Sequence, residues 1–432
     1  MQKPLILFRA GRAVYVAGCA VCAAVSLALF APLPISAEAN FGGDFISGFT
    51  FNVPGSDEYE SPVNPGNLLG VGDVTVTGVG DVTVTGEVNL KLDAAGETSA
   101  LDVWLQAGID ASGAAQTDII RANTTWMPSS DVRFTLGRQS FLTGYGYGWN
   151  PADLANPPKN PADPQGEVRG VDGINIRYSP ASWLTVRIFG LIPSGSTMWD
   201  YDDLLSGTEL TFYAPAVEVK LSGLYGGLES DDDAADSHPN AGAGAVYLDV
   251  AGIGVYAEGV IRSRSRRNDP ASDGDTPVIP DGPVGSGLFG VEYSFNSGLA
   301  LAAEYFFNGE GWDQDRRDDY ADALEALAAS TGITPGYFAL YTPAYYARHY
   351  LLLNLGIPLY AIDSNANLNL IYSPDSPAFM VTPEAAFNLN YEGTLVSELR
   401  YSALVSLDDG AKNEAWLSPV HQSVLLNLKY FF

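Results

Sequence analysis

The chain ends on the stretch SVLLNLKYFF, residues 423–432. Every second residue from Phe432 back to Val424 is apolar or aromatic, whereas Asn427 and Lys429 lie on the interleaved positions. A period of two indicates a β-strand with one apolar face and one mixed face. About ten residues are also the length that a tilted strand needs to cross a bilayer. The ending therefore predicts a membrane-crossing strand, with a core strand of a soluble sandwich or solenoid as the alternative.

The aromatic last residue adds a likeness to a known class of protein. An alternating strand that closes on Phe432 resembles the C-terminal signal of bacterial outer-membrane β-barrels of the porin type. The resemblance implies that the assembly machinery reads this strand and that the cell outer membrane is its location. No motif points to one porin subfamily. The residues implied as the membrane assembly signal are Leu426, Leu428, Tyr430 and Phe432.

The N-terminal segment has the organisation of an export signal. A basic start is followed by an apolar run over residues 14–30 and by the small-x-small site Ala37-Glu38-Ala39. We therefore expect residues 1–39 to be a signal peptide and residues 40–432 to form the outer-membrane barrel. The two cysteines, Cys19 and Cys22, fall inside the predicted signal. The mature chain is therefore expected to use neither disulfides nor thiol chemistry.

Charge and composition limit the classes of partner. The chain has 51 acidic residues against 22 lysines and arginines, a formal net charge of −29. This balance disfavours nucleic acid as a partner and disfavours a polybasic membrane-surface patch. The mean hydropathy of +0.04 is what strands with alternating lipid-facing and lumen-facing residues should give. We expect no cofactor and no metal site.

The connections between alternating segments differ in length at the two ends of the strands. Short connections such as 127–130 and 296–298 contain Pro, Ser, Asn or Gly, whereas long ones such as 226–240 and 308–345 are acidic. Short turns on one side and long loops on the other are typical of outer-membrane barrels. We predict an all-β, antiparallel up-and-down transmembrane barrel of about 16–18 strands with a constriction-type loop.

One segment, residues 140–170, departs from alternation and joins the fifth and sixth predicted strands. An irregular stretch of this length inside a compact domain is usually functional or disordered, and its aromatic residues argue against disorder. The resemblance to porins implies a loop that enters the lumen; a rigid external loop at the rim is the alternative. The candidate constriction residues are Tyr145, Tyr147, Trp149, Asp153, Lys159 and Asp163.

Charged residues of inward parity flank this loop. Arginines on the neighbouring strands face carboxylates predicted on the other part of the barrel, which would create a transverse field across the lumen. Pairing of these charges with one another is the alternative. The predicted pore-lining residues are Arg121, Arg133, Arg138, Arg177, Arg187, Glu258, Glu292, Glu304 and Glu398.

The function that these patterns favour is a porin-like channel for passive diffusion of small hydrophilic solutes or ions. The −29 charge should enrich cations near the mouth, whereas an arginine wall at the narrowest point would prefer anions. Outer-membrane lipid, lipopolysaccharide and the assembly machinery are the expected partners, and the sequence leaves monomer and homotrimer open. One alternative is a surface-exposed barrel for adhesion or assembly without conductance. An outer-membrane hydrolase is less favoured, because the three histidines lie in no recognisable nucleophile–base arrangement.

Overall fold

The computed structural model describes residues 38–53, 81–109, 115–192, 204–226, 239–266, 282–319, 344–408, 413–418 and 422–432. Nearly all of the predicted signal peptide lies outside these residues, so its assignment stays a prediction. Among the residues described, no helix is both long enough and apolar enough to cross a membrane.

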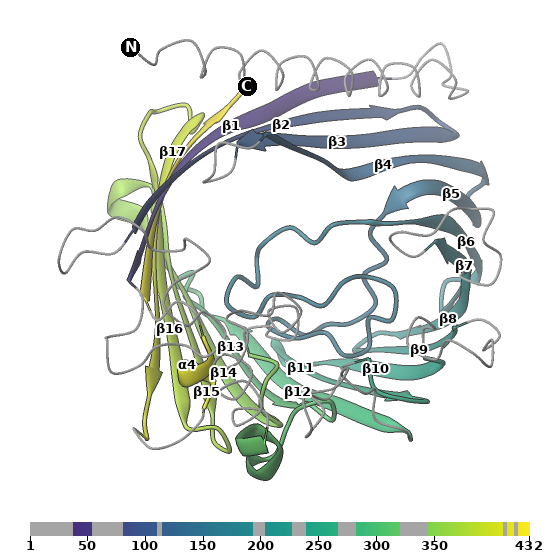
Figure 1. Ribbon diagram of the computed structural model, residues 1–432. Coiled ribbons are helices and arrows are strands. Elements are labelled where there is room, and N and C mark those ends of the chain that lie inside the picture. The colour runs from purple at the N-terminus through teal and green to yellow at the C-terminus, as the bar shows by residue number, and fades with distance from the viewer. Residues whose placement is uncertain are drawn as a thin grey trace.

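The described residues form a single antiparallel sheet of 18 strands that closes on itself (Figure 1). Consecutive strands are neighbours throughout, which is the up-and-down order. Strand and helix bounds are β1 Glu38–Val53, β2 Asp81–Ala95, β3 Ser99–Ile109, β4 Ala115–Ser129, β5 Val132–Gln139, β6 Val171–Ala181, β7 Leu184–Ile192, β8 Leu205–Ala214, β9 Val217–Tyr225, β10 Ala241–Val250, β11 Ile253–Arg262, β12 Val284–Ser294, β13 Ala300–Phe307, β14 His349–Leu359, η3 Tyr360–Ile362, β15 Ser364–Ser373, β16 Ala378–Asn388, β17 Leu395–Ser406, α4 Glu414–Leu417 and β18 Gln422–Phe431.

The last strand is the closing seam of the barrel. On one side β18 pairs antiparallel with β17, and on the other it pairs with β1, where Tyr430 lies opposite Phe45 and Leu428 opposite Ser47. Closure leaves no strand edge unpaired, which is the condition for crossing a bilayer with strands. The predicted strand count and antiparallel order are confirmed, whereas the assembly signal stays a prediction.

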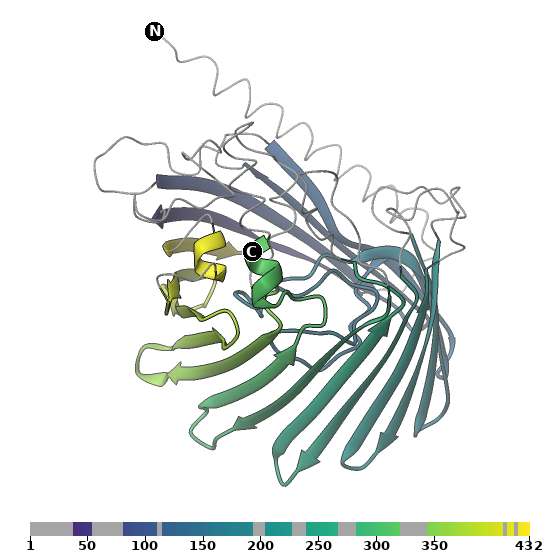
Figure 2. The same ribbon diagram turned by 60° about the horizontal axis from the view of Figure 1, so that its bottom comes forward.

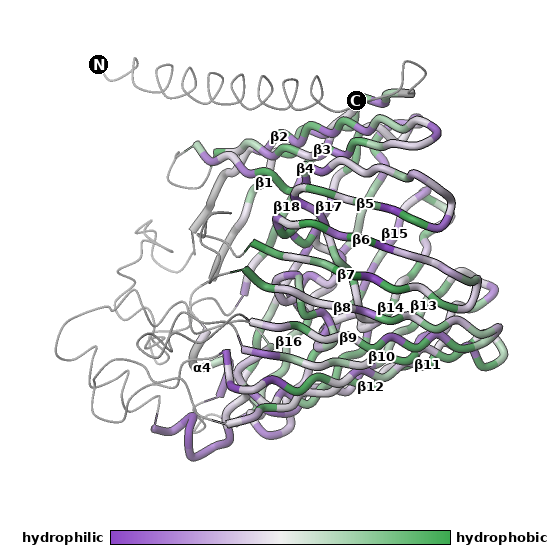
Figure 3. The backbone as a smooth tube through the Cα atoms, turned by 90° about the vertical axis from the view of Figure 1, so that its right-hand side faces the viewer, coloured by the Kyte–Doolittle hydropathy of each residue, from purple (hydrophilic) through white to green (hydrophobic). Residues whose placement is uncertain are grey.

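Alternation along the strands separates an apolar outer face from a mixed inner face. In β18, Leu426, Leu428 and Tyr430 are 42–50% exposed on the outer face. On the inner face, Lys429 lies 2.6 Å from Glu398 of β17. Figure 3 shows the same alternation of apolar and polar residues along the other strands. Lipid is the solvent that makes an apolar outer face stable, so the pattern fits a transmembrane barrel.

The short turns gather at one end of the barrel (Figures 2 and 3). The hairpin between β10 and β11 has only Ala251 and Gly252 between the strands, both with positive φ (55° and 85°). Two such residues form the turn whose twist matches paired strands, which explains a glycine there. At the opposite end, β5 and β6 are joined by residues 140–170. The predicted asymmetry of connections therefore holds for these strands.

Candidate functional site

Residues 140–170 lie inside the ring of strands rather than over its rim (Figures 1 and 2). We call this segment the inner loop. Its centre is anchored by Trp149, which is fully buried and lies against Phe306 of β13 and Tyr350 of β14 with ring centroids 5.1 and 5.7 Å away. The indole Nε1 of Trp149 donates to the backbone oxygen of Ala344 at 3.0 Å. A large buried aromatic with a satisfied N–H is a strong packing anchor.

Two carboxylates hold the backbone of the inner loop. Glu258 of β11 accepts hydrogen bonds from the amides of Tyr145, Gly146 (2.7 Å) and Ala152 (3.1 Å). Glu304 of β13 accepts from the amides of Tyr147 and Gly148 (2.9 Å), and from the hydroxyl of Tyr256 at 2.7 Å. An irregular loop that is buried must find partners for its backbone groups. Ionised carboxylates are the strongest acceptors available to it.

The glycines of the motif GYGYGW, residues 144–149, make this approach possible. A Cβ added at Gly144 would lie 2.5 and 2.6 Å from the two carboxylate oxygens of Glu258, closer than real Cβ contacts. A Cβ at Gly148 would lie 2.4 Å from Leu352 Cδ1 of the wall. Glycine at these positions lets the backbone reach the carboxylates and the wall.

A half-buried lysine, Lys159, also holds the inner loop from within. Lys159 Nζ donates to the backbone oxygens of Gly146 (2.6 Å) and Tyr147 (3.4 Å). Burial lowers the pKa of Lys159 below its ordinary value, and the charges of Glu304 and Glu258 offset only part of that effect. The lysine therefore closes the loop's own fold at the place where the two carboxylates hold it.

The inner loop then crosses the lumen to the other side. Asn369 of β15 donates to the Pro161 oxygen at 2.7 Å, and Arg400 of β17 forms a two-point ion pair with Asp163 at 2.9 and 3.0 Å. The returning arm pairs Glu167 with Arg121 of β4. Among the described residues, no hydrogen bond or ion pair joins the inner loop to β18, β1, β2 or β3. The loop thus covers one wall and leaves another open.

Three of the predicted pore-lining arginines form a row on neighbouring strands. Arg133 lies opposite Arg177, and Arg177 opposite Arg187, in the registers of β5, β6 and β7. Arg187 is buried, donates to the Phe141 oxygen at 3.0 Å and lies 3.5 Å from Glu209. Arg133 and Arg177 have no ion pair with another described residue. The row therefore presents two unpaired guanidinium groups and one that holds the start of the inner loop.

The remaining predicted arginines lie at the base of the loop. Arg121 pairs with Glu167 and lies over the Trp104 ring, 5.4 Å from its centroid. Arg138 makes a two-point contact with Asp172 of β6. It shares a face of β5 with Leu136, which is 56% exposed on the outer side. Arg138 therefore has the outward parity of β5 at the loop's start, and the structure does not place it among the pore-lining residues, contrary to the prediction.

The predicted carboxylates do not form one open acidic wall. Glu258 and Glu304 are 6% and 3% exposed and are occupied by the inner loop. Glu292 accepts from the Tyr247 hydroxyl at 3.0 Å, and Glu398 binds Lys429. The structure therefore brings the arginine row together, but it separates the four carboxylates into two loop anchors and two paired wall residues.

Sequence reasoning overlooked a polar cluster on the open wall. Trp104 of β3 donates to Asn89 of β2 at 3.0 Å, and Asn89 donates to Asp44 of β1 at 2.8 Å. Lys91 Nζ lies 3.9 Å from the Trp104 ring centroid, in cation–π range. Asn89 and Lys91 occupy the inward positions of β2, so alternation in the sequence could have identified both as residues that face the lumen. Their partners on β1 and β3 depend on register, which the sequence does not specify.

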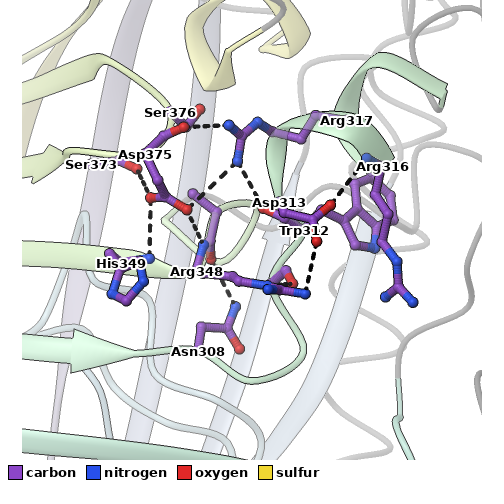
Figure 4. Close-up of polar contacts among 12 residues, drawn as sticks. Asn308, Trp312, Asp313, Arg316, Arg317, Arg348, His349, Ser373, Asp375 and Ser376 are labelled. Atoms are coloured by element: carbon purple, nitrogen blue, oxygen red, sulfur yellow. Dashed lines mark hydrogen bonds and ion pairs between the residues drawn. The ribbon is translucent and has the colours of Figure 1, made fainter.

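A second polar cluster lies at the end of the barrel that carries the long connection after β13 (Figure 4). Asp375 accepts from the amides of Arg348 (3.0 Å) and His349 (3.2 Å) and lies 3.6 Å from Arg317. Arg317 is buried, and it also donates to the Trp312 oxygen at 2.7 Å. These charges satisfy one another, so the cluster ties the connection after β13 to the β15–β16 turn.

Nothing in the described residues forms a metal site, because no group of three His, Cys, Asp or Glu side chains could hold an ion. Of the three histidines, His349 lies within the described residues. It packs on the outer face, with its Nδ1 2.8 Å from the Tyr305 hydroxyl. The other two histidines, His238 and His421, lie outside the described residues.

Comparison with known proteins identifies the fold. No family model matches the chain, and no curated protein matches it. Among solved structures, OccAB1 of Acinetobacter baumannii has a TM-score of 0.54 at 9% identity, covering 91% of this chain and 96% of that one. The fold is that of a bacterial outer-membrane porin-type barrel. OccAB4 of the same organism (TM-score 0.53, 7% identity, coverage 91% and 98%) and OccK11 (OpdR) of Pseudomonas aeruginosa (0.50, 11%, 92% and 96%) are similar. At these identities the likeness concerns the fold alone.

Proposed function

We propose that the chain is an outer-membrane channel for passive diffusion of small hydrophilic solutes or ions, and not an enzyme. The observation that carries the proposal is the inner loop, which is anchored from β7 to β17 and, among the described residues, makes no hydrogen bond or ion pair with β18, β1, β2 or β3. A barrel of 18 strands is wide enough for an aqueous lumen. A loop held inside such a lumen narrows it without closing it.

The narrowest passage in this proposal lies between the returning arm of the inner loop, residues 163–167, and the open wall of β18, β1, β2 and β3. Polar and charged side chains line that wall, including Asp44, Lys91 and Gln106. A charged constriction selects solutes by sign and orients them. Selectivity therefore depends on the inner loop together with the inward arginines.

Single-channel recording in planar bilayers tests the proposal. The refolded protein should give discrete conductance steps. Changing Arg121, Arg133 and Arg177 together to Gln should shift the reversal potential in a salt gradient toward cation preference, because positive lumen charge is lost. The absence of any conductance would instead favour a surface-exposed barrel for adhesion or assembly. Conductance with unchanged selectivity would remove the arginines from the proposal.

We also propose that the outer face contacts lipid and lipopolysaccharide and that the assembly machinery reads the last strand. The alternation that ends on Phe432, with Leu426, Leu428 and Tyr430 exposed on the outer face, supports this. Deleting Phe432 should lower the amount of barrel inserted in the outer membrane. The same deletion should leave refolding into detergent much less affected. Cross-linking of the inserted barrel distinguishes a monomer from a homotrimer.

A further inference from the structure

A recess lies between the inner loop and the barrel wall. It is a small recess that is open to solvent. Asn150, Asp153 and Asn156 line it from the loop, Arg262 and Phe306 line it from the wall, and Tyr345 lines it from the connection before β14. Its position inside the barrel separates it from the lipid-facing surface.

Arg262, at the end of β11, is the unusual residue of this recess. It is only 4% exposed. No hydrogen bond or ion pair joins its guanidinium to another of the described residues, although it lines the recess. Its neighbour Ile261 is 66% exposed on the outer face, so Arg262 has inward parity. Arg317 is equally buried but has a carboxylate and a carbonyl as partners.

Both carboxylates near Arg262 are already occupied. Glu310 accepts from the Arg266 amide at 2.6 Å, from the Arg266 guanidinium at 3.3 Å and from the Ser265 hydroxyl at 3.4 Å. Burial alone would raise the pKa of Glu310, but Arg266 and Arg262 hold it below its ordinary value. Glu310 thus stays ionised and is engaged mainly by Arg266.

Asp153 is likewise engaged by its own loop. It accepts from the amides of Ala155 (3.1 Å) and Asn156 (3.0 Å) and from the Asn156 side chain at 2.7 Å. A buried charge without a partner is costly, and a guanidinium offers several donors in a fixed plane. Arg262 is therefore the cationic group among the described residues of this recess whose hydrogen-bonding capacity is unspent, and the Asn150 Oδ1 is an acceptor there that is also without a hydrogen-bond partner.

We infer that the recess is a binding station for one oxyanionic group of a small solute, with Arg262 as its main donor. Ser286 lines the same recess, and its oxygen accepts from the Gly309 amide at 3.0 Å, which leaves its hydroxyl proton available. A carboxylate, phosphate or sulfate shares the required chemistry. The station deepens the proposed channel function, since it would hold anions outside the narrowest passage, but binding does not depend on conductance.

Equilibrium binding to the folded barrel in detergent tests the station. Isothermal titration calorimetry with inorganic phosphate, sulfate and acetate, at constant ionic strength with chloride as background, should give saturable binding of at least one oxyanion. Arg262→Gln should weaken it about tenfold or more, because a charge-assisted contact is lost. Arg262→Lys should weaken it less. Arg348→Gln is the matched control and should leave binding unchanged, because Arg348 does not line the recess and is paired with Asp313 at 3.1 Å.

Thermal unfolding gives an independent readout. The bound oxyanion should raise the unfolding temperature of the native protein and of Arg348→Gln, but not that of Arg262→Gln. Without added oxyanion, Arg262→Met should still fold, because Glu310 keeps its hydrogen bonds to Arg266. The absence of oxyanion binding by the native barrel, or equal binding by Arg262→Gln, would overturn the station while leaving the conductance test of the proposed function untouched.

Discussion

The two halves of the barrel interior differ in how they use charge. On the covered wall, Glu258 and Glu304 of β11 and β13 are buried and bind backbone amides of the inner loop. On the open wall, Lys91 and Asp44 of β2 and β1 lie 3.6 Å apart, and the lysine is 39% exposed. Inward charges are therefore of two kinds, those that hold the loop and those that face the passage. Alternation along a strand identifies both kinds of charge as inward-facing but does not distinguish one kind from the other.

The largest effect on conductance is expected from removing the inner loop. Replacing residues 143–165 with a short Gly/Ser linker should raise the unit conductance severalfold, because the inner loop fills lumen that would otherwise carry ions. The linker is sterically feasible, since Gln139 and Val171 are paired at the ends of β5 and β6. Single-channel recording measures the change. Unchanged conductance would mean that the loop does not border the passage.

The aromatic anchor of the covered wall should dominate its stability. Trp149→Ala removes a fully buried ring and is expected to cost about 3–5 kcal/mol in the free energy of unfolding. Denaturant titration of the folded barrel measures this cost. Trp126→Ala, in which the ring is 54% exposed on the outer face, is the matched control and should cost much less. Equal costs would contradict the role of Trp149 as the loop's anchor.

Neutralising the two carboxylate anchors should loosen the loop without unfolding the barrel. The double change Glu258→Gln and Glu304→Gln weakens charge-assisted contacts to loop amides, and we expect a loss of about 2–4 kcal/mol in unfolding free energy. Open-channel current noise should rise as well. Glu292→Gln serves as control, because Glu292 accepts a hydrogen bond from Tyr247 of the wall and not from the inner loop. If the open-channel current noise does not rise in the double variant, other contacts are sufficient to hold the inner loop.

Charge on the open wall should set selectivity more than charge under the loop. Lys91→Gln removes a positive group that faces the passage, so the reversal potential should move modestly toward cation preference. Glu258→Gln changes a charge enclosed by the loop and should move the reversal potential less. The comparison is made at low ionic strength, where screening is weakest. A larger shift for Glu258→Gln would reverse the assignment of the two walls.

The smallest effect concerns pH. The folded pKa of Lys159 lies below its ordinary value of 10.5, so the unfolded chain binds more protons between these two values. Stability should therefore rise with pH across this alkaline window. The slope should be smaller in Lys159→Met, which has no proton to lose. Unfolding free energies measured at several alkaline pH values give both slopes, and identical slopes would exclude Lys159 as their source.

The sequence was sufficient for the barrel and for only part of its interior. Alternation along β18 predicted both its length and its outer face, because lipid selects residues by parity. The seam between Tyr430 and Phe45 followed from closure. In contrast, the hydrogen bond from the Gly146 amide to Glu258 joins residues 112 positions apart in the chain. The local sequence of neither segment predicts it. The sequence did not single out Arg262, since its burial and its lack of a hydrogen-bonded partner are properties of the folded chain.

The central claim is that solutes pass along the open wall. The two cysteines, Cys19 and Cys22, precede residue 40, so single cysteines can be introduced into the barrel without competing thiols. Gln106→Cys on the open wall should react with a charged, membrane-impermeant thiol reagent, and the current through the channel should fall as it reacts. Leu352→Cys, under the inner loop, should react slowly and leave the current unchanged. Block at Leu352→Cys with none at Gln106→Cys would contradict the claim.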